Sequence, residues 1–300
     1  MAHPAAAAYG ARPLDGGFSG ETYLVEGPTG PAVLRVYARE PQRAAIDASL
    51  LHLVRGLLPV PRVLDLRRPD PARPAEPAHL LTTFEPGVRL SEVLPHADAG
   101  LSRALAASVA RMLATLSGMP FLRAATFVDA DLRLAERAAP ADGLVEWLDQ
   151  HVDGTALGGW DPSLLRSLRR VCATADDLLD VVGRVCLAHS DFNPKNILVD
   201  PHTATVTAVV DWEYAMAGSP YADLGNLLRF ERGNDWTRRV LEHYVALTPP
   251  APADPLLLGY ASDLWALIDL AARTARNPVT EAASHLLAAM ARTGDLAARP

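Results

Sequence analysis

The sequence predicts an α+β protein with two lobes, a small sheet-rich lobe over residues 1–85 and a larger, mostly helical lobe over residues 86–300. Short β-type runs bounded by glycine and proline recur before residue 85. From Leu90 onward, apolar residues recur instead at helical spacing over longer segments. A chain of 300 residues is also long for a single hydrophobic core, which favours two lobes.

A glycine-rich hairpin is the first predicted element, within Leu14–Glu26. Its glycines at positions 16, 17 and 20 permit a tight backbone that can come close to phosphate groups. Such a hairpin is usually only a turn. Placed ahead of the polar loop described below, it becomes a candidate nucleotide flap. The flap residues are Gly17, Phe18, Ser19, Gly20 and Thr22.

The rest of the first lobe is predicted to be three strands around one helix. The strands lie at 31–37, at 63–66 and from 79 into the turn at 86–87. The first of these strands carries Arg35. Between the first two strands, apolar residues at helical spacing from position 46 to position 57 predict a helix that holds Asp47.

The second lobe is predicted to be a set of helices around a central polar stretch. Residues 101–116 have helical apolar spacing and no proline, as expected for a core helix. Further helices are predicted at 146–153, 162–179, 223–229, 235–246, 255–275 and 279–292.

The central stretch runs from Arg184 to Arg229, and its strands end in polar residues. The apolar run 185–188 leads into His189-Ser-Asp-Phe-Asn-Pro-Lys-Asn196. The β-rich run 205–210 leads into Asp211-Trp-Glu213. The pattern therefore predicts two short strands, each of which delivers polar side chains from its end.

These residue types fit the chemistry of phosphoryl transfer. That reaction needs a group that accepts the proton of the substrate hydroxyl, and oxygen ligands for magnesium. Asp191 can accept the proton, whereas Asn196 and Asp211 offer the hard oxygen ligands that Mg²⁺ prefers. The order His-x-Asp-x-x-x-x-Asn, followed by a strand and Asp, is specific as a set, although each piece alone is weak.

At these residues the chain resembles the aminoglycoside phosphotransferase and choline-kinase-like branch of the protein-kinase-like fold. The matching residues are His189, Asp191, Pro194, Asn196, Asp211, Glu213, Gly218, Pro220, Asp223 and Leu224. Asp-Trp-Glu stands where protein kinases have Asp-Phe-Gly, which favours a small-molecule kinase. The nearest resemblance is to actinomycete antibiotic phosphotransferases of the capreomycin phosphotransferase type. It implies the two-lobed protein-kinase-like fold with the active site in the cleft, ATP or GTP as the nucleotide, and Mg²⁺.

The resemblance also implies roles for residues of the polar stretch. Asp191 would be the catalytic base, and His189 would support the loop by hydrogen bonding. Asp223 would brace the backbone of this loop. The implied metal ligands are Asn196, Asp211 and, through an outer contact, Glu213.

In the first lobe, Arg35 stands where the family has lysine. It would hold the nucleotide phosphates with a bulkier, bidentate group, although an ordinary surface arginine is the alternative. Asp47 is the predicted carboxylate partner of Arg35, and Glu40 is the second candidate. Phe84 and Glu85 resemble the hinge, whose main chain contacts the purine edge.

Lysine occurs only once among the 28 Lys and Arg residues, at Lys195. This residue directly precedes Asn196 in the polar loop. It either contacts the transferred phosphate or the acceptor, which would make it a catalytic residue, or it is a solvated loop lysine.

The acceptor is predicted to be a small cationic molecule. A net charge of −7 argues against a nucleic-acid partner and is compatible with a cation drawn to an acidic cleft. Candidate acceptor-binding residues are Glu231, Asp235, Asp263 and Asp269, although each alone is more often a solvated helix charge. The best candidate is a tuberactinomycin peptide such as capreomycin; an aminoglycoside, a macrolide or a metabolite hydroxyl remains an alternative.

Two functions of other classes also remain. A nucleotide-binding pseudokinase would share the fold, but Asp191, Asn196 and Asp211 speak against it. A serine hydrolase built on Ser190 would lack the Gly-x-Ser-x-Gly elbow of that class.

The composition predicts a cytoplasmic protein, and we expect a monomer or weak dimer. Cys172 and Cys186 do not make a disulfide framework, and the start lacks the basic region of a signal peptide. The sequence contains no uncharged apolar stretch of about 18 residues, which is the length that a membrane span would need. We therefore expect no membrane partner.

Overall fold

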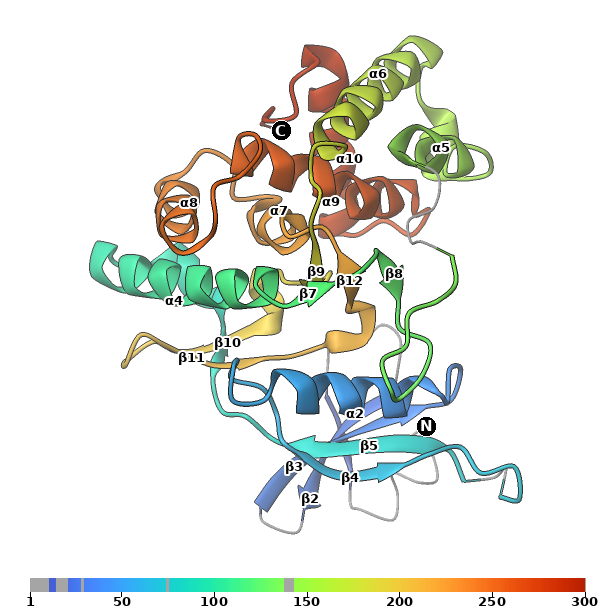
Figure 1. Ribbon diagram of the computed structural model, residues 1–300, viewed down its shortest axis with the longest axis vertical. Coiled ribbons are helices and arrows are strands. Elements are labelled where there is room, and N and C mark those ends of the chain that lie inside the picture. The colour runs from blue at the N-terminus through green and yellow to red at the C-terminus, as the bar shows by residue number, and fades with distance from the viewer. Residues whose placement is uncertain (1–10, 15–20, 28–29, 74–75, 138–142, 300) are drawn as a thin grey trace. The chain divides into compact units, whose positions relative to one another are not determined.

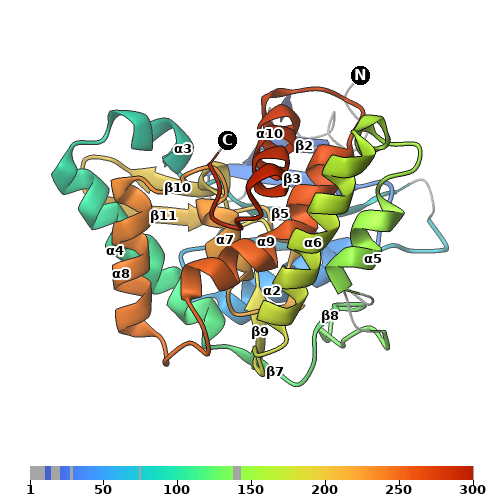
Figure 2. The same cartoon turned by 90° about the horizontal axis from the view of Figure 1, so that it is seen from above.

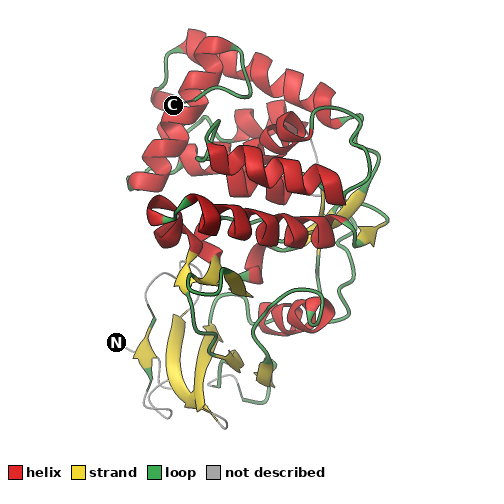
Figure 3. Cartoon of the chain, turned by 90° about the vertical axis from the view of Figure 1, so that its left-hand side faces the viewer, coloured by secondary structure: helices red, strands yellow, loops and turns green. Residues whose placement is uncertain are grey.

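The computed structural model describes residues 11–14, 21–27, 30–73, 76–137 and 143–299. The chain forms two compact units. The first unit comprises residues 1–96, 126–135 and 194–215, and the second comprises 97–125, 136–193 and 216–300. The predicted single division after residue 85 is simpler than this arrangement, because the first unit also takes in two segments from later in the chain. Strands dominate the first unit and helices the second (Figure 3).

An antiparallel sheet forms the centre of the first unit (Figure 1). Its strands, in spatial order, are β1 (Arg12–Pro13), β2 (Glu21–Gly27), β3 (Gly30–Tyr37), β5 (Ala78–Thr83) and β4 (Val63–Arg67). Side chains alternate along β3, so Ala32, Leu34 and Val36 are buried while Arg35 lies on the other face. The register places Thr22 on one side of Arg35 and Leu80 on the other. This face of the sheet carries part of the candidate site.

Helix α2 (Arg43–Val54) packs against strands of this sheet. It begins three residues before the predicted apolar pattern, which starts at position 46, because the buried Ala44 and Ala45 extend the apolar face toward the N-terminus. It ends before Gly56, whose φ of 84° is a left-handed conformation that suits glycine.

A second, three-stranded sheet of the first unit has the order β11-β10-β6. Strands β10 (Ile197–Asp200) and β11 (Thr205–Val209) form an antiparallel hairpin, in which β11 corresponds to the predicted strand at 205–210, and β6 (Val88–Arg89) pairs with β10. Helix α3 (Leu90–Val93) follows β6. This hairpin brings Asn196, directly before β10, close to Asp211, which follows β11.

Seven helices are the main described elements of the second unit (Figure 2). They are α4 (Ala99–Ser117), α5 (Gly143–Gln150), α6 (Pro162–Leu179), α7 (Ala222–Leu228), α8 (Asp235–Leu247), α9 (Pro255–Ala272) and α10 (Pro278–Thr293). Five of them begin after a residue whose side chain accepts a hydrogen bond from an amide of the first turn, which satisfies donors that the helix itself leaves unpaired. These capping residues are Asp98, Asp161, Asn234, Asp254 and Asn277.

Helix α9 lies beside α6, α7 and α10 and supplies much of the core of this unit. It crosses α7 closely at Gly225, where an added Cβ would lie 1.9 Å from the carbonyl oxygen of Gly259. By length and composition α9 is the one described helix that could cross a membrane, with a mean hydropathy of 1.2. It is 61% buried inside the structure, and a buried core helix passes the same test, so this is weak evidence of a span.

A small sheet in the second unit positions the polar loop. Strand β9 (Val185–Ala188) lies between β7 (Pro120–Phe121) and β12 (Met216–Gly218), and β8 (Ala125–Thr126) ends the sheet. Ala188 pairs with Met216 at the end of β9, directly before His189. Both cysteines are free and buried in this unit.

Candidate active site

The polar loop of the second unit is fixed by Asp223, in the first turn of α7. Both carboxylate oxygens of Asp223 accept a main-chain hydrogen bond of 2.8 Å, one from the amide of His189 and one from that of Ser190. Ser190 has a φ of 64°, an unusual left-handed conformation that such bonds can hold. Burial raises the pKa of Asp223, whereas His189 and the two amides oppose that rise. Asp223 therefore braces the loop, as the resemblance implies.

Asp191 is held within the same loop. Its Oδ1 accepts a hydrogen bond of 2.6 Å from Nδ2 of Asn193, and its amide donates to Nδ1 of His189 at 3.3 Å. The ring of His189 is fully buried and meets the ring of Phe192 edge-on at 5.9 Å. His189 thus contacts the loop backbone, and the carboxylate of Asp191 is oriented by a neighbouring amide.

In the first unit, the β10–β11 hairpin brings Asn196 and Asp211 to neighbouring positions. Ile197 pairs with Val209, and the amide of Val210 donates to the carbonyl of Asn196 at 3.0 Å. Asn196 therefore lies opposite Val210, and Val210 directly precedes Asp211. Asp211 has a φ of 68°, a strained conformation for a residue other than glycine, which is typical of functional sites.

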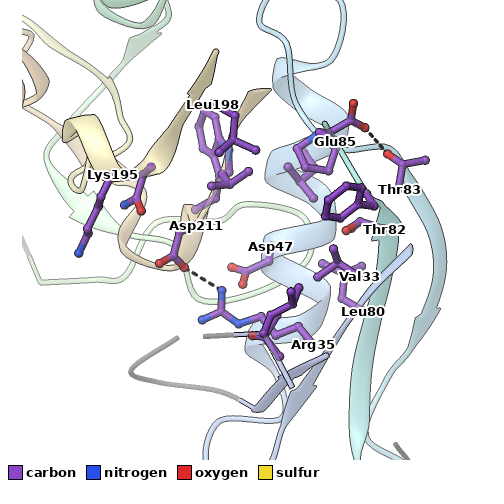
Figure 4. A pocket seen from close by; sticks show the side chains of 18 of the residues that line it. Val33, Arg35, Asp47, Leu80, Thr82, Thr83, Glu85, Lys195, Leu198 and Asp211 are labelled. Atoms are coloured by element: carbon purple, nitrogen blue, oxygen red, sulfur yellow. Dashed lines mark hydrogen bonds and ion pairs between the residues drawn. The ribbon is translucent and has the colours of Figure 1, made fainter. Parts of the chain in front are cut away.

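The guanidinium of Arg35 meets two carboxylates of the turn after β11. Its Nη1 donates to Oδ1 of Asp211 at 2.9 Å (Figure 4). Its Nη2 donates to Glu213. Burial alone would lower the pKa of Arg35, but Tyr37, Asp211 and Glu213 raise it, so the guanidinium stays charged. Two carboxylates thus converge on one cation.

Asp47 on α2 has other partners than predicted. It accepts hydrogen bonds from the hydroxyl of Tyr37 at 2.7 Å and from Nε of Arg43 at 2.6 Å. Burial and Asp47 raise the pKa of Tyr37, which keeps its hydroxyl a donor. The predicted ion pair of Asp47 with Arg35 is therefore replaced, among the described residues, by a pair one helical turn apart, Arg43 and Asp47.

A cavity of about 320 Å³ lies in the first unit, between the sheet and the β10–β11 hairpin. One part of its lining is apolar and includes Val33, Leu80 and Leu198. Another part is ionic and includes Arg35 and Asp211 (Figure 4). A pocket of this size and polarity fits a small ligand with a flat apolar part and a charged part.

A model of the phosphotransferase enzyme family, APH, matches residues 10–256. The chain belongs to this family. It is similar to an aminoglycoside 3'-phosphotransferase from Streptomyces fradiae, with 31% identity over 226 residues, which are 71% of this chain and 78% of that protein. The prediction of a phosphotransferase is confirmed.

Solved structures of related phosphotransferases share the fold. The aminoglycoside phosphotransferase APH(4)-Ia has a TM-score of 0.66 and 18% identity, covering 95% of this chain and 94% of that one. A variant of aminoglycoside 2'-phosphotransferase-IIIa, in a GDP complex, has a TM-score of 0.65 and 18% identity, covering 95% of this chain and 86% of that one. At this identity the likeness shows the fold alone, and it confirms the α+β, protein-kinase-like prediction.

The predicted nucleotide-binding residues fall into two groups in this phosphotransferase. Gly17, Phe18, Ser19 and Gly20 of the predicted flap lie outside the described residues. Thr22, Arg35, Asp47, Phe84 and Glu85 all line the cavity.

At the predicted hinge, Phe84 and Glu85, one main-chain group is not available to a purine. The amide of Phe84 donates to the carbonyl of Pro31 at 3.2 Å, so it is already engaged within the sheet. The hydroxyl of Thr83, which accepts a hydrogen bond from the amide of Arg62 at 2.8 Å, donates one to Glu85.

Lys195 lies on the turn before Asn196, is exposed and also lines the cavity.

The four predicted acceptor-binding carboxylates occupy different environments. Asp263 is 3% exposed and pairs with Arg229 through two hydrogen bonds of 2.7 Å, so its charge is already neutralised inside the protein. Asp235 is an exposed helix residue and Asp269 a half-buried one, and both pair with nearby arginines. Glu231 accepts a hydrogen bond of 2.7 Å from Asn234. The structure thus favours a structural role for Asp263.

Three partners of buried carboxylates were not predicted from the sequence: Arg43, Tyr37 and Arg229. Arg43 and Asp47 are four residues apart, which is the spacing of ion pairs on a helix, so this pair could have been found. Tyr37 and Arg229 carry no such signal. They become partners of carboxylates only through the packing of β3 on α2 and of α7 on α9.

Proposed function

We propose that this phosphotransferase moves the γ-phosphate of ATP or GTP to a hydroxyl group of a small cationic antibiotic, with Mg²⁺ as the metal. The observation that carries the proposal is the cavity of the first unit, whose apolar wall suits a purine and whose ionic end suits phosphates and a cation. Named relatives support it, because one was solved with ADP and hygromycin B and another with GDP.

The residues at the ionic end fit a magnesium ion. Asp211 and Glu213 already converge on the cationic group of Arg35. Asn196 lines the same cavity as Asp211 and can contribute an amide oxygen. Carboxylate and amide oxygens, completed by phosphate oxygens and water, are the usual ligands of Mg²⁺. Among the described residues, no cluster of three or more His, Cys, Asp or Glu side chains could hold a metal ion, so the amide and the phosphates are proposed to complete the ligand set. When bound, the ion would neutralise charge on the phosphates.

Asp191 is the proposed base, which receives the proton of the acceptor hydroxyl. Its carboxylate is oriented by Asn193, and its loop is braced by Asp223. Rigid placement of this kind is what a general base needs, because the proton is transferred within hydrogen-bond distance. Arg35 and Lys195 are proposed to bind the phosphates, to which both can present a positive charge.

Two acceptors are proposed in order. A tuberactinomycin peptide such as capreomycin is favoured by the resemblance of the polar loop and by the net charge of −7, which suits a cationic molecule. An aminoglycoside is the second candidate, because a relative of 31% identity is an aminoglycoside 3'-phosphotransferase. Both reactions are proposed to take place in the cytoplasm.

The test is a panel of hydroxylated antibiotics incubated with ATP or GTP, with Mg²⁺ or with a chelator. Mass spectrometry follows the addition of one phosphoryl group to each compound. We expect addition to capreomycin, or to an aminoglycoside, only when Mg²⁺ is present. Asp191→Asn serves as the matched control and should form product at least about 10²-fold more slowly. Nucleotide binding without transfer to any member of the panel would favour the pseudokinase.

A further inference from the structure

Arg43, the first residue of α2, connects this helix to the turn formed by Asp211, Trp212 and Glu213, here called the 211–213 turn. Its Nη2 donates to the carbonyl oxygen of Trp212 at 2.9 Å, and its Nε donates to Asp47 at 2.6 Å. The side chain of Arg43 is 15% exposed and that of Asp47 is 5% exposed. The contact is therefore made in a largely dry part of the first unit, where a charged hydrogen bond is strong.

The 211–213 turn needs contacts that hold its shape. Asp211 has the left-handed φ of 68°, a conformation that is strained for a residue other than glycine. The peptide group between Trp212 and Glu213 carries the carbonyl that Arg43 holds. The amide of Ala215 donates to the same oxygen at 3.0 Å, and the indole of Trp212 donates to the carbonyl of Val209 at 3.1 Å.

Arg35 and Arg43 act on different parts of this turn. Arg35 bonds the carboxylates of Asp211 and Glu213, which are the groups that a metal ion would also use. Arg43 bonds the main chain and leaves both carboxylates to other partners. A contact to the main chain can persist when the carboxylates exchange a guanidinium for an ion.

Asp47 fixes the direction of Arg43. Its carboxylate bonds Nε of Arg43 on one oxygen and the hydroxyl of Tyr37, from β3, on the other. The guanidinium is thus held at two points, Asp47 and Trp212, in the fork geometry that arginine offers and lysine does not.

We propose that Arg43, oriented by Asp47, is a positioning residue that keeps the 211–213 turn in the shape needed to bind the metal ion of the metal–nucleotide complex. This inference rests on the proposed function, in which Asp211 is a metal ligand. It makes Asp47 part of the site through Arg43, whereas the resemblance placed it beside Arg35.

The test measures how strongly Mg²⁺ promotes the binding of ADP. Calorimetry on the full chain gives the affinity for ADP in a chelator and over a series of Mg²⁺ concentrations, for the wild type, Arg43→Ala and Arg43→Lys. Arg133→Ala is the matched control, because Arg133 pairs with Asp129 at an exposed position of the same unit. Thermal unfolding of each variant checks that it is folded.

We expect Arg43→Ala to raise the Mg²⁺ concentration needed for half-maximal promotion by about 10- to 100-fold, the usual effect of losing a group that orients a metal ligand. Its affinity for ADP in chelator should equal that of the wild type and of Arg133→Ala. Arg43→Lys, which keeps the charge but can make only one of the two contacts, should lie between. If Arg43→Ala does not fold, Arg43→Lys gives the same comparison.

Two results would overturn the inference, and they separate it from the proposed function. In the first result, ADP binding by the wild type depends on Mg²⁺ and both Arg43 variants need the same Mg²⁺ concentration as the wild type. This result would exclude the role of Arg43 and leave the proposed function in place. An equal loss of ADP affinity with and without Mg²⁺ does the same, because it indicates a general structural effect. Wild-type binding that ignores Mg²⁺ removes the metal role of Asp211 as well.

Discussion

Replacing Arg35 tests whether a guanidinium and a metal ion use the same carboxylates. The side chain is 16% exposed, with Asp211 at 2.9 Å and Glu213 as its second partner. In Arg35→Met, both carboxylates lose their shared cation, and removing one partner of a buried pair costs about 3–5 kcal/mol. Because Asp211 is 25% exposed, solvent screens part of this effect, and we expect a loss of about 2 kcal/mol. The melting temperature should fall by roughly 4–8 °C.

Magnesium should restore much of that loss in the absence of nucleotide. The two carboxylates of Arg35→Met are available to the ion, whereas in the wild type the ion must displace the guanidinium. The assay is thermal unfolding followed by circular dichroism over a Mg²⁺ series at constant ionic strength, which separates binding from screening. Arg35→Lys, with one compact charge, should be intermediate. Equal stabilisation of wild type and Arg35→Met by Mg²⁺ would refute the reasoning.

Three further changes test the rest of the site. Asp191→Asn should lower turnover by about 10²–10⁴-fold with nucleotide binding intact, as steady-state kinetics and calorimetry would show; an active variant removes Asp191 from its role. Asp211→Ala should make ADP binding independent of Mg²⁺, and retained dependence would contradict its assignment as a ligand. Lys195→Ala should reduce turnover with partial recovery in Lys195→Arg, whereas wild-type kinetics would make Lys195 a solvated residue. Burial raises the pKa of the Cys172 and Cys186 thiols to about 12, so both should resist a thiol reagent at pH 8 until the protein unfolds. Since unfolded thiols ionise near pH 9, stability should also fall as the pH rises above that value, and fast labelling of the native protein would contradict this burial.

The bounds of a helix could be predicted from the sequence where its apolar periodicity and its capping residues agreed. Helix α6 has its predicted bounds, because Asp161 caps it and Pro162 begins it. Helix α9 was predicted to reach residue 275 but ends at Ala272, because Arg273 has an extended backbone and residues 273–275 are exposed, so they bury no apolar face. The start of α2 was placed too late because alanines carry a weak hydrophobic signal, although Ala44 and Ala45 are buried.

The neighbouring positions of Asn196 and Asp211 could also be predicted, because a hairpin of known register brings its two ends together. The partners of buried charges could not. Asp263 was predicted as a candidate acceptor-binding carboxylate, with a solvated helix charge as the alternative. Its helical neighbours gave no sign of Arg229, which lies at the end of another helix. Such pairs depend on which helix faces meet, and that information is spread over the whole chain.

The arginine at position 35 explains which carboxylates pair with which cations around the cavity of the first unit. Three carboxylates, those of Asp47, Asp211 and Glu213, meet only two guanidinium groups there in the contacts described above. A lysine at position 35 would offer one compact ammonium, whereas the arginine fork spans both Asp211 and Glu213. Asp47 is then left to a cation of its own helix, and Arg43 supplies it one turn away. Because Arg43 also reaches the main chain of the 211–213 turn, the exchange of partners ties α2 to the proposed metal ligands. A variant that restores lysine at position 35 should therefore depend less on Arg43 for its Mg²⁺ affinity, and a double-mutant cycle between positions 35 and 43 would measure that coupling.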